Sequence, residues 1–349
     1  MIYYEVRKWL FMKNTDFCIN KYMTEGHLSN IAIRVGKGDE VLFDLYKSKD
    51  KTIDETTLFD MASVTKIIVT TTLSFIAKDK GLLSFDTPVS AFFPVPEDKK
   101  EMTVKNLLTH TMGIGHKWLM GENNNDNIAK YILSIPSDKP IGTDVMYSCP
   151  GYILLGKIVE KVFGKRLDEA FYELVKKPLE LNDTAFLPDK EKNLVNSNVK
   201  DEEKGIVNDM NCRHLGCVAG NAGLFSNITD VTKYVKMLLD YGAPIIKRET
   251  FCEAIKNYTK EMSASRGLGF LYVDERYNQT GKLFPVGSIG HCGHTGQSVF
   301  VNIKCGLYVI ILSDATISTV KKYGYEDYSI VMKMREDIHN AIKADIDVL

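Results

Sequence analysis

The chain has 349 residues, in which 44 lysines and arginines stand against 45 aspartates and glutamates, so its formal net charge is −1. That balance argues against nucleic acid or an anionic membrane as the main partner. Hydrophobic residues make up 44% of the chain, but no apolar run reaches the roughly 18 residues of a transmembrane helix. We therefore expect a soluble protein with a sizeable core.

The start of the chain and its cysteines both predict a cytoplasmic location. Residues 1–8, MIYYEVRK, lack the basic segment, apolar core and cleavage site of a signal peptide. The seven cysteines are an odd number without a repeating spacing. We therefore expect free thiols in a reducing compartment rather than a disulfide framework.

The first half of the chain reads as a hairpin followed by helices. Apolar-rich strands at 31–35 and 41–46 flank a glycine-containing turn, which is typical of a hairpin. A long apolar run then predicts a buried helix from about Val64 to Lys78, ended by Gly81. Helical spacing continues through the middle of the chain, in segments at 104–109, 127–134, 150–163 and 167–175.

The second half returns to strands. Residues 188–216 form a long polar stretch that is expected to be a loop, and a helix is predicted at 230–241. Strand patterns at 298–303 and 307–313 predict a second hairpin, and the segment 325–346 reads as a closing helix.

These elements predict an α+β fold of the α/β-sandwich type. One antiparallel sheet of about five strands would be built from both termini and flanked by helices, with an inserted all-helical region. We expect residues 1–349 to form one unit. Its sheet-containing part would comprise 1–85 and 225–349, and its mainly helical insert 86–224. The crevice between the two parts is the expected site.

Ser63 is the candidate nucleophile. It opens the sequence Ser63-Val64-Thr65-Lys66 at the start of the buried helix, so the hydroxyl and the amine lie one turn apart on the same face. A neighbouring amine can activate a serine, and backbone N–H groups at a helix start can stabilise an oxyanion. The pattern Ser-x-x-Lys occurs four times, but only this copy precedes an apolar helix. A helix cap alone is the simpler alternative for this serine.

Further segments decide between these alternatives. Residues 107–113, the triplet Tyr147-Ser148-Cys149 and the triplet His294-Thr295-Gly296 follow Ser63 in order along the chain. Together with 59–66 they resemble the serine β-lactamase and penicillin-binding-protein family, in its class C β-lactamase and D-alanyl-D-alanine carboxypeptidase branch. The resemblance covers roughly residues 20 to 315. It implies a β-lactamase/transpeptidase-like fold and a serine hydrolase that cleaves an amide or ester through an acyl-Ser63 intermediate, without a cofactor or metal.

The resemblance also implies roles for individual residues. Lys66 and Tyr147 are the two candidate bases, and the choice between them stays open. The backbone N–H groups of Ser63 and Gln297 would form the oxyanion hole. A neighbouring ammonium is expected to lower the pKa of Tyr147.

The substrate-binding residues would come mainly from the triplet at 294–296. His294 and Thr295 would bind a substrate carboxylate or polarise the tyrosine, and Gly296 would allow the substrate backbone to come close. Cys149 stands where the family usually has asparagine. A thiol makes only weak hydrogen bonds, so we expect weaker contacts to Lys66 and to a substrate amide, which disfavours efficient β-lactam hydrolysis.

The expected substrate is a small-molecule or short-peptide acyl compound. Residues 205–220 resemble a bacterial subgroup, some of whose members are amidases that act on cell-wall muropeptides inside the cell, although Asn208 and Cys217 depart from its pattern. Peptidoglycan-derived peptides are therefore the first expectation, and a β-lactam could act as substrate or inhibitor. The alternatives are a β-lactamase or small-ester esterase of the same fold, or a non-catalytic sensor that is acylated by penicillin. The oligomeric state is not predicted.

A metal site is not expected. The cysteines and histidines at 212–217 and 291–294 could supply ligands, but their spacing matches no known zinc pattern.

Overall fold

The computed structural model describes residues 12–119, 127–277 and 279–348. Residues 1–8, on which the expectation about a signal peptide rests, lie outside the described residues. Within the described ranges the strands are β1 (Asn30–Lys37), β2 (Glu40–Ser48), β3 (Phe59–Asp60), β4 (Ala185–Phe186), β5 (Leu224–Ser226), β6 (Leu271–Tyr272), β7 (Ile289–Cys292), β8 (Ser298–Val301) and β9 (Leu307–Ser313). The helices are α2 (Lys13–Thr24), α3 (Thr72–Asp79), α4 (Val104–Leu108), α5 (Ile128–Ser134), α6 (Cys149–Phe163), α7 (Leu167–Phe171), α8 (Met210–His214), α9 (Ile228–Leu239), α10 (Arg248–Ala254), α11 (Ala315–Tyr323) and α12 (Tyr328–Ile346).

The main sheet is antiparallel and is built from both ends of the chain, as expected. Its strand order is β2-β1-β9-β8-β7-β6. The central pair joins β1 to β9, from Ile31 opposite Ser313 to Lys37 opposite Leu307. The sheet has six strands where about five were expected, because the sixth, β6, is a two-residue edge strand paired with β7. A strand so short leaves no alternation for a sequence pattern to detect.

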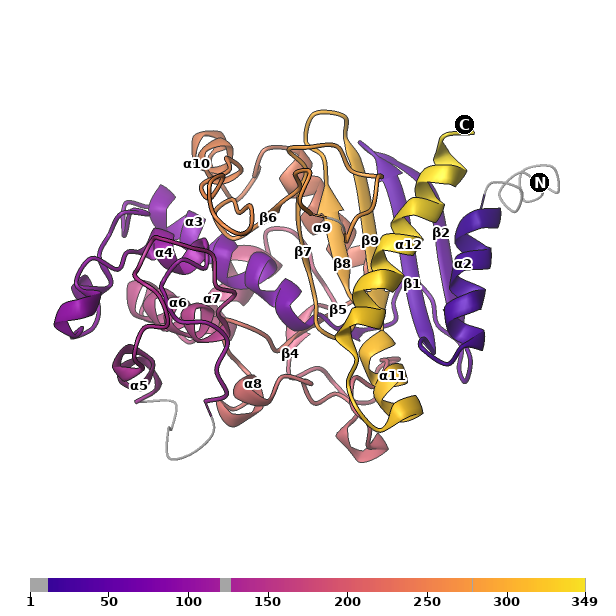
Figure 1. Cartoon of the computed structure of the whole chain (residues 1–349), viewed down its shortest axis with the longest axis horizontal. Coiled ribbons are helices and arrows are strands. Elements are labelled where there is room, and N and C mark those ends of the chain that lie inside the picture. The colour runs from indigo at the N-terminus through magenta and orange to yellow at the C-terminus, as the bar shows by residue number, and fades with distance from the viewer. Residues whose placement is uncertain (1–11, 120–126, 278, 349) are drawn as a thin grey trace.

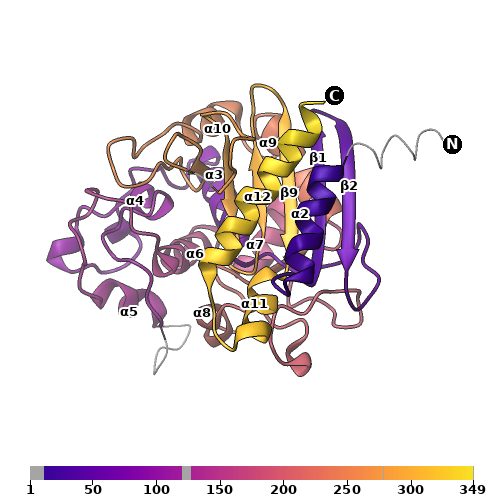
Figure 2. The same cartoon turned by 45° about the vertical axis from the view of Figure 1, so that its right-hand side comes forward.

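Both faces of the sheet are covered (Figures 1 and 2). The helices α2 and α12 lie side by side on one face, and α9 packs against β1, β8 and β9 on the other. Alternate residues of β9 accordingly enter two different cores. Val309 and Ile311 face α2 and α12, whereas Ile310 and Leu312 join the core shared with the helical part. Burial on both faces explains why this strand is an unbroken apolar run.

The helix behind Ser63 differs from the regular helix that was predicted at 64–78. It begins as a 3₁₀ turn, Ala62–Val64, continues as a π-helical segment, Lys66–Thr71, and becomes α-helical only in α3. The carbonyl oxygen of Ile67 accepts hydrogen bonds from the Thr72 hydroxyl at 2.9 Å and from the Tyr234 hydroxyl at 2.9 Å. Side chains that bond to backbone carbonyls compete with the regular helical ladder and permit the wider turn.

Two further segments differ from the sequence prediction. The polar stretch 188–216 contains a 3₁₀ turn, Asp201–Glu203, and the short helix α8, whose first turn is capped by the Asp209 carboxylate accepting from the Cys212 N–H at 2.7 Å. The unpredicted helix α11 precedes α12. Among the described residues, no helix combines the length and the apolar character needed to cross a bilayer.

Candidate active site

Ser63 lies in the 3₁₀ turn that follows β3, and the backbone on both sides of it is fixed. The Asp60 carboxylate accepts a hydrogen bond from the Ala62 N–H at 2.8 Å. The Met61 N–H donates to the Leu224 carbonyl of β5 at 2.9 Å. Ala62 has a φ of +44°, which is strained for a residue with a side chain. Strain held in this way by surrounding contacts is common where a side chain must be aimed at a reacting group.

Two side chains donate hydrogen bonds to the Ser63 hydroxyl. The Tyr147 hydroxyl donates to Ser63 Oγ at 2.7 Å, and Lys66 Nζ donates to the same atom at 2.9 Å. Lys66 is fully buried. Its ammonium also donates to the Asn221 carbonyl at 2.9 Å and lies 3.6 Å from Cys149 Sγ. The geometry is that of a serine with two proton-carrying groups in direct contact.

Tyr147 is positioned by the start of α6. The next residue, Ser148, caps that helix, because its hydroxyl accepts from the Gly151 N–H at 3.0 Å. The Ser148 N–H in turn donates to His110 Nδ1 at 3.0 Å. The His110 ring packs against the Tyr147 ring with 4.6 Å between the centroids. The phenol is therefore held by a helix cap and a buried ring.

Both candidate bases carry protons at neutral pH. Burial raises the pKa of Tyr147 to about 12, and the opposing effect of the Lys66 ammonium is smaller. The ammonium does lower this pKa, as expected, but burial outweighs it and the net direction is upward. Burial alone lowers the pKa of Lys66, but Cys149 and Tyr147, when ionised, raise it, and the net direction is upward. Burial likewise raises the pKa of the Cys149 thiol.

A cavity of about 910 Å³ opens beside Ser63. Its wall includes Tyr147 and Cys149, residues of the polar stretch 198–213, and side chains from the sheet end of the molecule. Trp118 and Val199 line it while remaining 61% and 51% exposed, so apolar surface is available at its edge. Such a volume suits a small-molecule or short-peptide ligand.

In the triplet at 294–296, His294 lines the cavity and Thr295 lies in the core. The Nε2 of His294 lies 3.1 Å from the Glu326 carboxylate, and its ring stacks on Tyr328 at 5.3 Å. Thr295 is buried, and its hydroxyl donates to Gln297 Oε1 at 2.6 Å. The structure thus does not bring the Thr295 hydroxyl to the cavity wall, because it is already hydrogen-bonded in the core. Gly296 has a φ of +127°, and a Cβ there would lie 2.1 Å from Ser313 Oγ, so only glycine fits.

Gln297 immediately precedes β8. Its side-chain amide donates to the Ser313 carbonyl at 3.0 Å and is buried. The side chain is therefore part of the core, which leaves the backbone N–H as the group available for the predicted oxyanion role.

Several residues at the site were missed by sequence reasoning. They are Asn221, whose carbonyl holds Lys66, and the cavity-lining Arg266, His291 and Glu326. For Arg266 a signal exists, since a single charged residue stands among small and apolar residues at 264–270. Within the described part of the chain, no group of three or more histidine, cysteine or acidic side chains could hold a metal ion.

Comparison with known proteins places these features in context. The Beta-lactamase family model matches residues 16–325. An N-acetylmuramyl-L-alanine amidase of Bacillus subtilis (strain 168) is 28% identical over 244 residues, which are 59% of this chain and 54% of the amidase. A putative D-alanyl-D-alanine carboxypeptidase of Escherichia coli (strain K12) is 27% identical over 309 residues, 76% of this chain and 70% of that protein.

Solved structures agree on the fold. EstCE1, a hydrolase with promiscuous acyltransferase activity, superposes with a TM-score of 0.78 over 97% of this chain and 100% of its own at 17% identity. This chain spans about half the length of the amidase, so the activity of the whole amidase does not transfer directly.

Proposed function

Because this chain belongs to the beta-lactamase family, we propose that it is a serine acyl hydrolase that cleaves an amide or ester bond through an acyl-Ser63 intermediate. The predicted family, fold and enzyme class are confirmed by the family match and by relatives named as hydrolases. One observation supports the assignment of the reaction to Ser63. Its oxygen receives hydrogen bonds from Tyr147 at 2.7 Å and from Lys66 at 2.9 Å, at the edge of a ligand-sized cavity.

The proposed reaction uses the two neighbours as one proton reservoir. Once Tyr147 and Lys66 together have lost one proton, they accept the Ser63 proton as its oxygen attacks the acyl carbon. The backbone N–H groups of Ser63 and Gln297 stabilise the negative oxygen that develops. The same proton then passes to the leaving group as its bond to the acyl carbon breaks. A water then gives a proton to the same pair and attacks the acyl carbon. The bond between that carbon and Ser63 breaks, the serine oxygen takes the proton, and the acid is released.

The proposed substrate is a peptidoglycan-derived peptide, supported by the names of the amidase and carboxypeptidase relatives. A small ester is the second candidate, and Cys149 favours it. The thiol lies 3.6 Å from Lys66, where an amide side chain would offer stronger hydrogen bonds to a substrate amide. A non-catalytic sensor is the remaining alternative.

Labelling with a fluorophosphonate probe tests the nucleophile. Intact mass and peptide mapping should show one adduct, on Ser63, and Ser63→Ala should abolish it. Ser48→Ala, which alters another serine of the same four-residue pattern, should label normally. An adduct on any other residue would contradict the proposal. Turnover of a chromogenic ester, a cephalosporin and a muropeptide then separates the substrates, and acylation without turnover would favour the sensor. The cytoplasmic location stays a prediction, which cell fractionation checks.

A further inference from the structure

Arg266 is a buried cation on the wall of the active-site cavity. It is only 7% exposed and lines the same cavity as Ser63 and Tyr147. Its Nε and Nη1 atoms are shielded from solvent and have no hydrogen-bond partner among the described residues. A guanidinium stays charged at any physiological pH, and leaving such a charge buried and unpaired is strongly unfavourable. An arginine held in this way is expected to meet an anion that arrives with a ligand.

The groups around Arg266 do not neutralise it. The ionisable side chains that interact most strongly with its charge are Tyr147, Tyr152, Tyr277 and Cys292. None of these four is a carboxylate. His291 also lines the cavity. Burial and the nearby guanidinium lower its pKa well below the usual value, so it is neutral. Its Nδ1 lies 2.7 Å from the Cys292 carbonyl and donates to it, which leaves its buried Nε2 as an acceptor.

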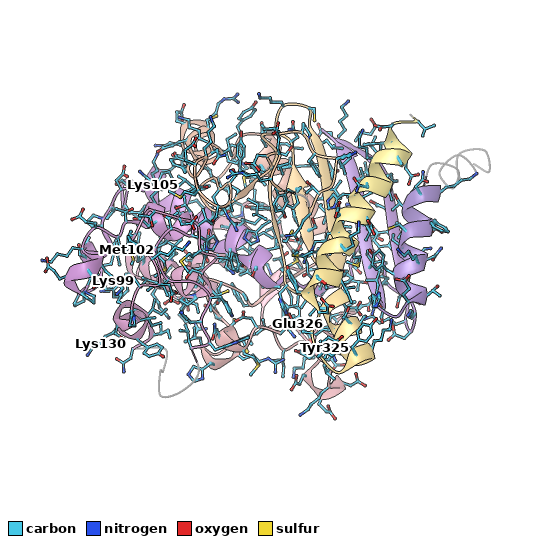
Figure 3. The ribbon with its side chains drawn as sticks, viewed as in Figure 1. Lys99, Met102, Lys105, Lys130, Tyr325 and Glu326 are labelled. Atoms are coloured by element: carbon cyan, nitrogen blue, oxygen red, sulfur yellow. The ribbon has the colours of Figure 1, made fainter. Side chains whose placement is uncertain are left out.

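Two other basic side chains nearby, His294 and Arg335, already have partners. His294, the residue first expected to bind a substrate carboxylate, faces Glu326 at 3.1 Å. Figure 3 shows Glu326 beside the lower end of α12. A carboxylate approaching His294 would therefore meet a carboxylate already in place. Arg335 is equally buried, but it donates through Nη1 to Gln279 and Tyr328 and through Nη2 to the Gly293 carbonyl.

The backbone that carries Arg266 is rigid. Its N–H donates to Thr259 Oγ1 at 2.8 Å, and its carbonyl accepts from the Tyr258 N–H at 2.8 Å. The following turn packs onto the helix behind Ser63, because a Cβ at Gly269 would lie 2.3 Å from Thr71 Oγ1. The backbone that carries the buried guanidinium is thus held in place relative to the nucleophile, which favours a preorganised binding group.

The position of Arg266 indicates which part of the substrate it meets. Its guanidinium carbon lies 5.7 Å from the centre of the Tyr147 ring, and the proton carried by Tyr147 is destined for the leaving group. We propose that Arg266, rather than His294, binds a carboxylate carried by the leaving group of the substrate. This inference rests on the proposed acyl transfer at Ser63, and it makes Arg266 a specificity-determining residue.

Two isosteric esters test the proposal. 3-Acetoxybenzoate and 3-acetoxybenzamide have the same acyl group, and their leaving groups differ in charge. We expect the unsubstituted protein to favour the carboxylate by about tenfold or more in kcat/KM, as a charge-assisted bidentate contact permits. Arg266→Gln should reduce that ratio to about twofold or less, whereas His294→Gln should change it by less than about threefold. Arg266→Lys, which keeps the charge, should retain part of the preference.

The outcomes separate the alternatives. If Arg266 acts only through Tyr147, both esters will slow in parallel and the ratio will not change, which overturns the proposal. If the kcat/KM ratio of the two esters falls in His294→Gln instead, the carboxylate binds at His294. That result also overturns the proposal. Should Arg266→Gln fail to fold, the unsubstituted protein still decides, because a ratio of one or less contradicts a carboxylate subsite. If Ser63→Ala still hydrolyses either ester, the proposed function fails, whatever the ratio.

Discussion

The Ser63 oxygen accepts hydrogen bonds from two groups that both carry protons at neutral pH. Tyr147 and Lys66 each donate to it, and the pKa of each is raised above its ordinary value. Neither can act as a base until the pair has lost a proton. The resting arrangement therefore positions the nucleophile, but Tyr147 or Lys66 must lose a proton before Ser63 can react.

Replacing Tyr147 with phenylalanine removes one of the proton carriers and keeps the ring against His110. We expect kcat for ester hydrolysis to fall by about 10²–10⁴-fold, the usual contribution of a positioned acid–base group. Tyr152→Phe is the matched control, since that buried hydroxyl contacts Thr71 and not Ser63, and its effect should be far smaller. Steady-state rates with phenyl acetate measure the difference. Equal losses in the two variants would contradict an acid–base role.

The activity of the unsubstituted protein should also depend on pH. An acid whose pKa is raised to about 12 keeps its proton through neutral pH. The fraction of protein with a free base therefore increases with pH, and kcat/KM should increase with it from neutral to alkaline values. Rates corrected for uncatalysed hydrolysis check the slope. A profile that is flat or falls from about pH 6 to 9 would mean that the base is already free at neutral pH.

The sequence motifs identified the site residues, but they did not predict the pKa values or the charge environment of those residues. Ser63, Lys66, Tyr147 and His294 stand in recognisable patterns, and the first three meet within hydrogen-bonding distance. The raised pKa of Tyr147 depends on how deeply it is buried, which no pattern reports. Arg266 could not be assigned for the same reason, since its significance lies in the absence of a counter-ion among its described neighbours.

At the scale of secondary-structure elements, Asp60 joins three segments. It ends β3, accepts from the Ala62 N–H of the nucleophile turn at 2.8 Å, and accepts from the Asn208 N–H of the polar stretch at 2.7 Å. The polar stretch that forms part of the cavity wall is therefore attached to the turn that carries Ser63. Burial raises the pKa of this carboxyl to about 6, more than its hydrogen bonds lower it.

Asp60→Asn should change the pH dependence of stability in a defined direction. A carboxyl that binds its proton more tightly when folded contributes most below its ordinary pKa of about 4 and loses that contribution as the pH rises through 6. The unfolding free energy of the unsubstituted protein minus that of Asp60→Asn should therefore fall by about 2 kcal/mol between about pH 4 and 7. Urea unfolding at several pH values measures it, with the exposed Asp39→Asn as control. A difference that stays constant or grows with pH would contradict it.

The elements that sequence patterns predicted are those whose burial is periodic or continuous along the chain. β9 is buried on both faces, and α6 ends at Gly164 with a φ of +62°, so each has a clear signal. The π-helical segment 66–71 depends on contacts with Tyr234, 163 residues or more further along the chain. Its geometry is therefore a tertiary effect that a local pattern does not contain.

At the scale of the whole molecule, the first and last described helices hold one face of the sheet together. Figure 2 shows α2 and α12 packed side by side in front of β1 and β9. The Asp345 carboxylate at the end of α12 accepts from the backbone N–H of Asn14 at 3.0 Å and of Thr15 at 2.9 Å. Met12, the residue before α2, provides no side-chain cap. The last helix thus supplies the cap that the first helix lacks.

Asp345→Ala should therefore destabilise the protein without altering the chemistry at Ser63. Two N–H groups at the start of α2 would lose a charged acceptor that is itself buried, and we expect the unfolding free energy to fall by about 2–3 kcal/mol. Asp347→Ala, which removes an exposed carboxylate paired with Lys343, should cost less than about 1 kcal/mol. Urea unfolding measures both changes, and amide hydrogen exchange should show faster opening of α2 in Asp345→Ala alone. Equal small losses in the two variants would mean that apolar packing, not the cap, joins the two helices.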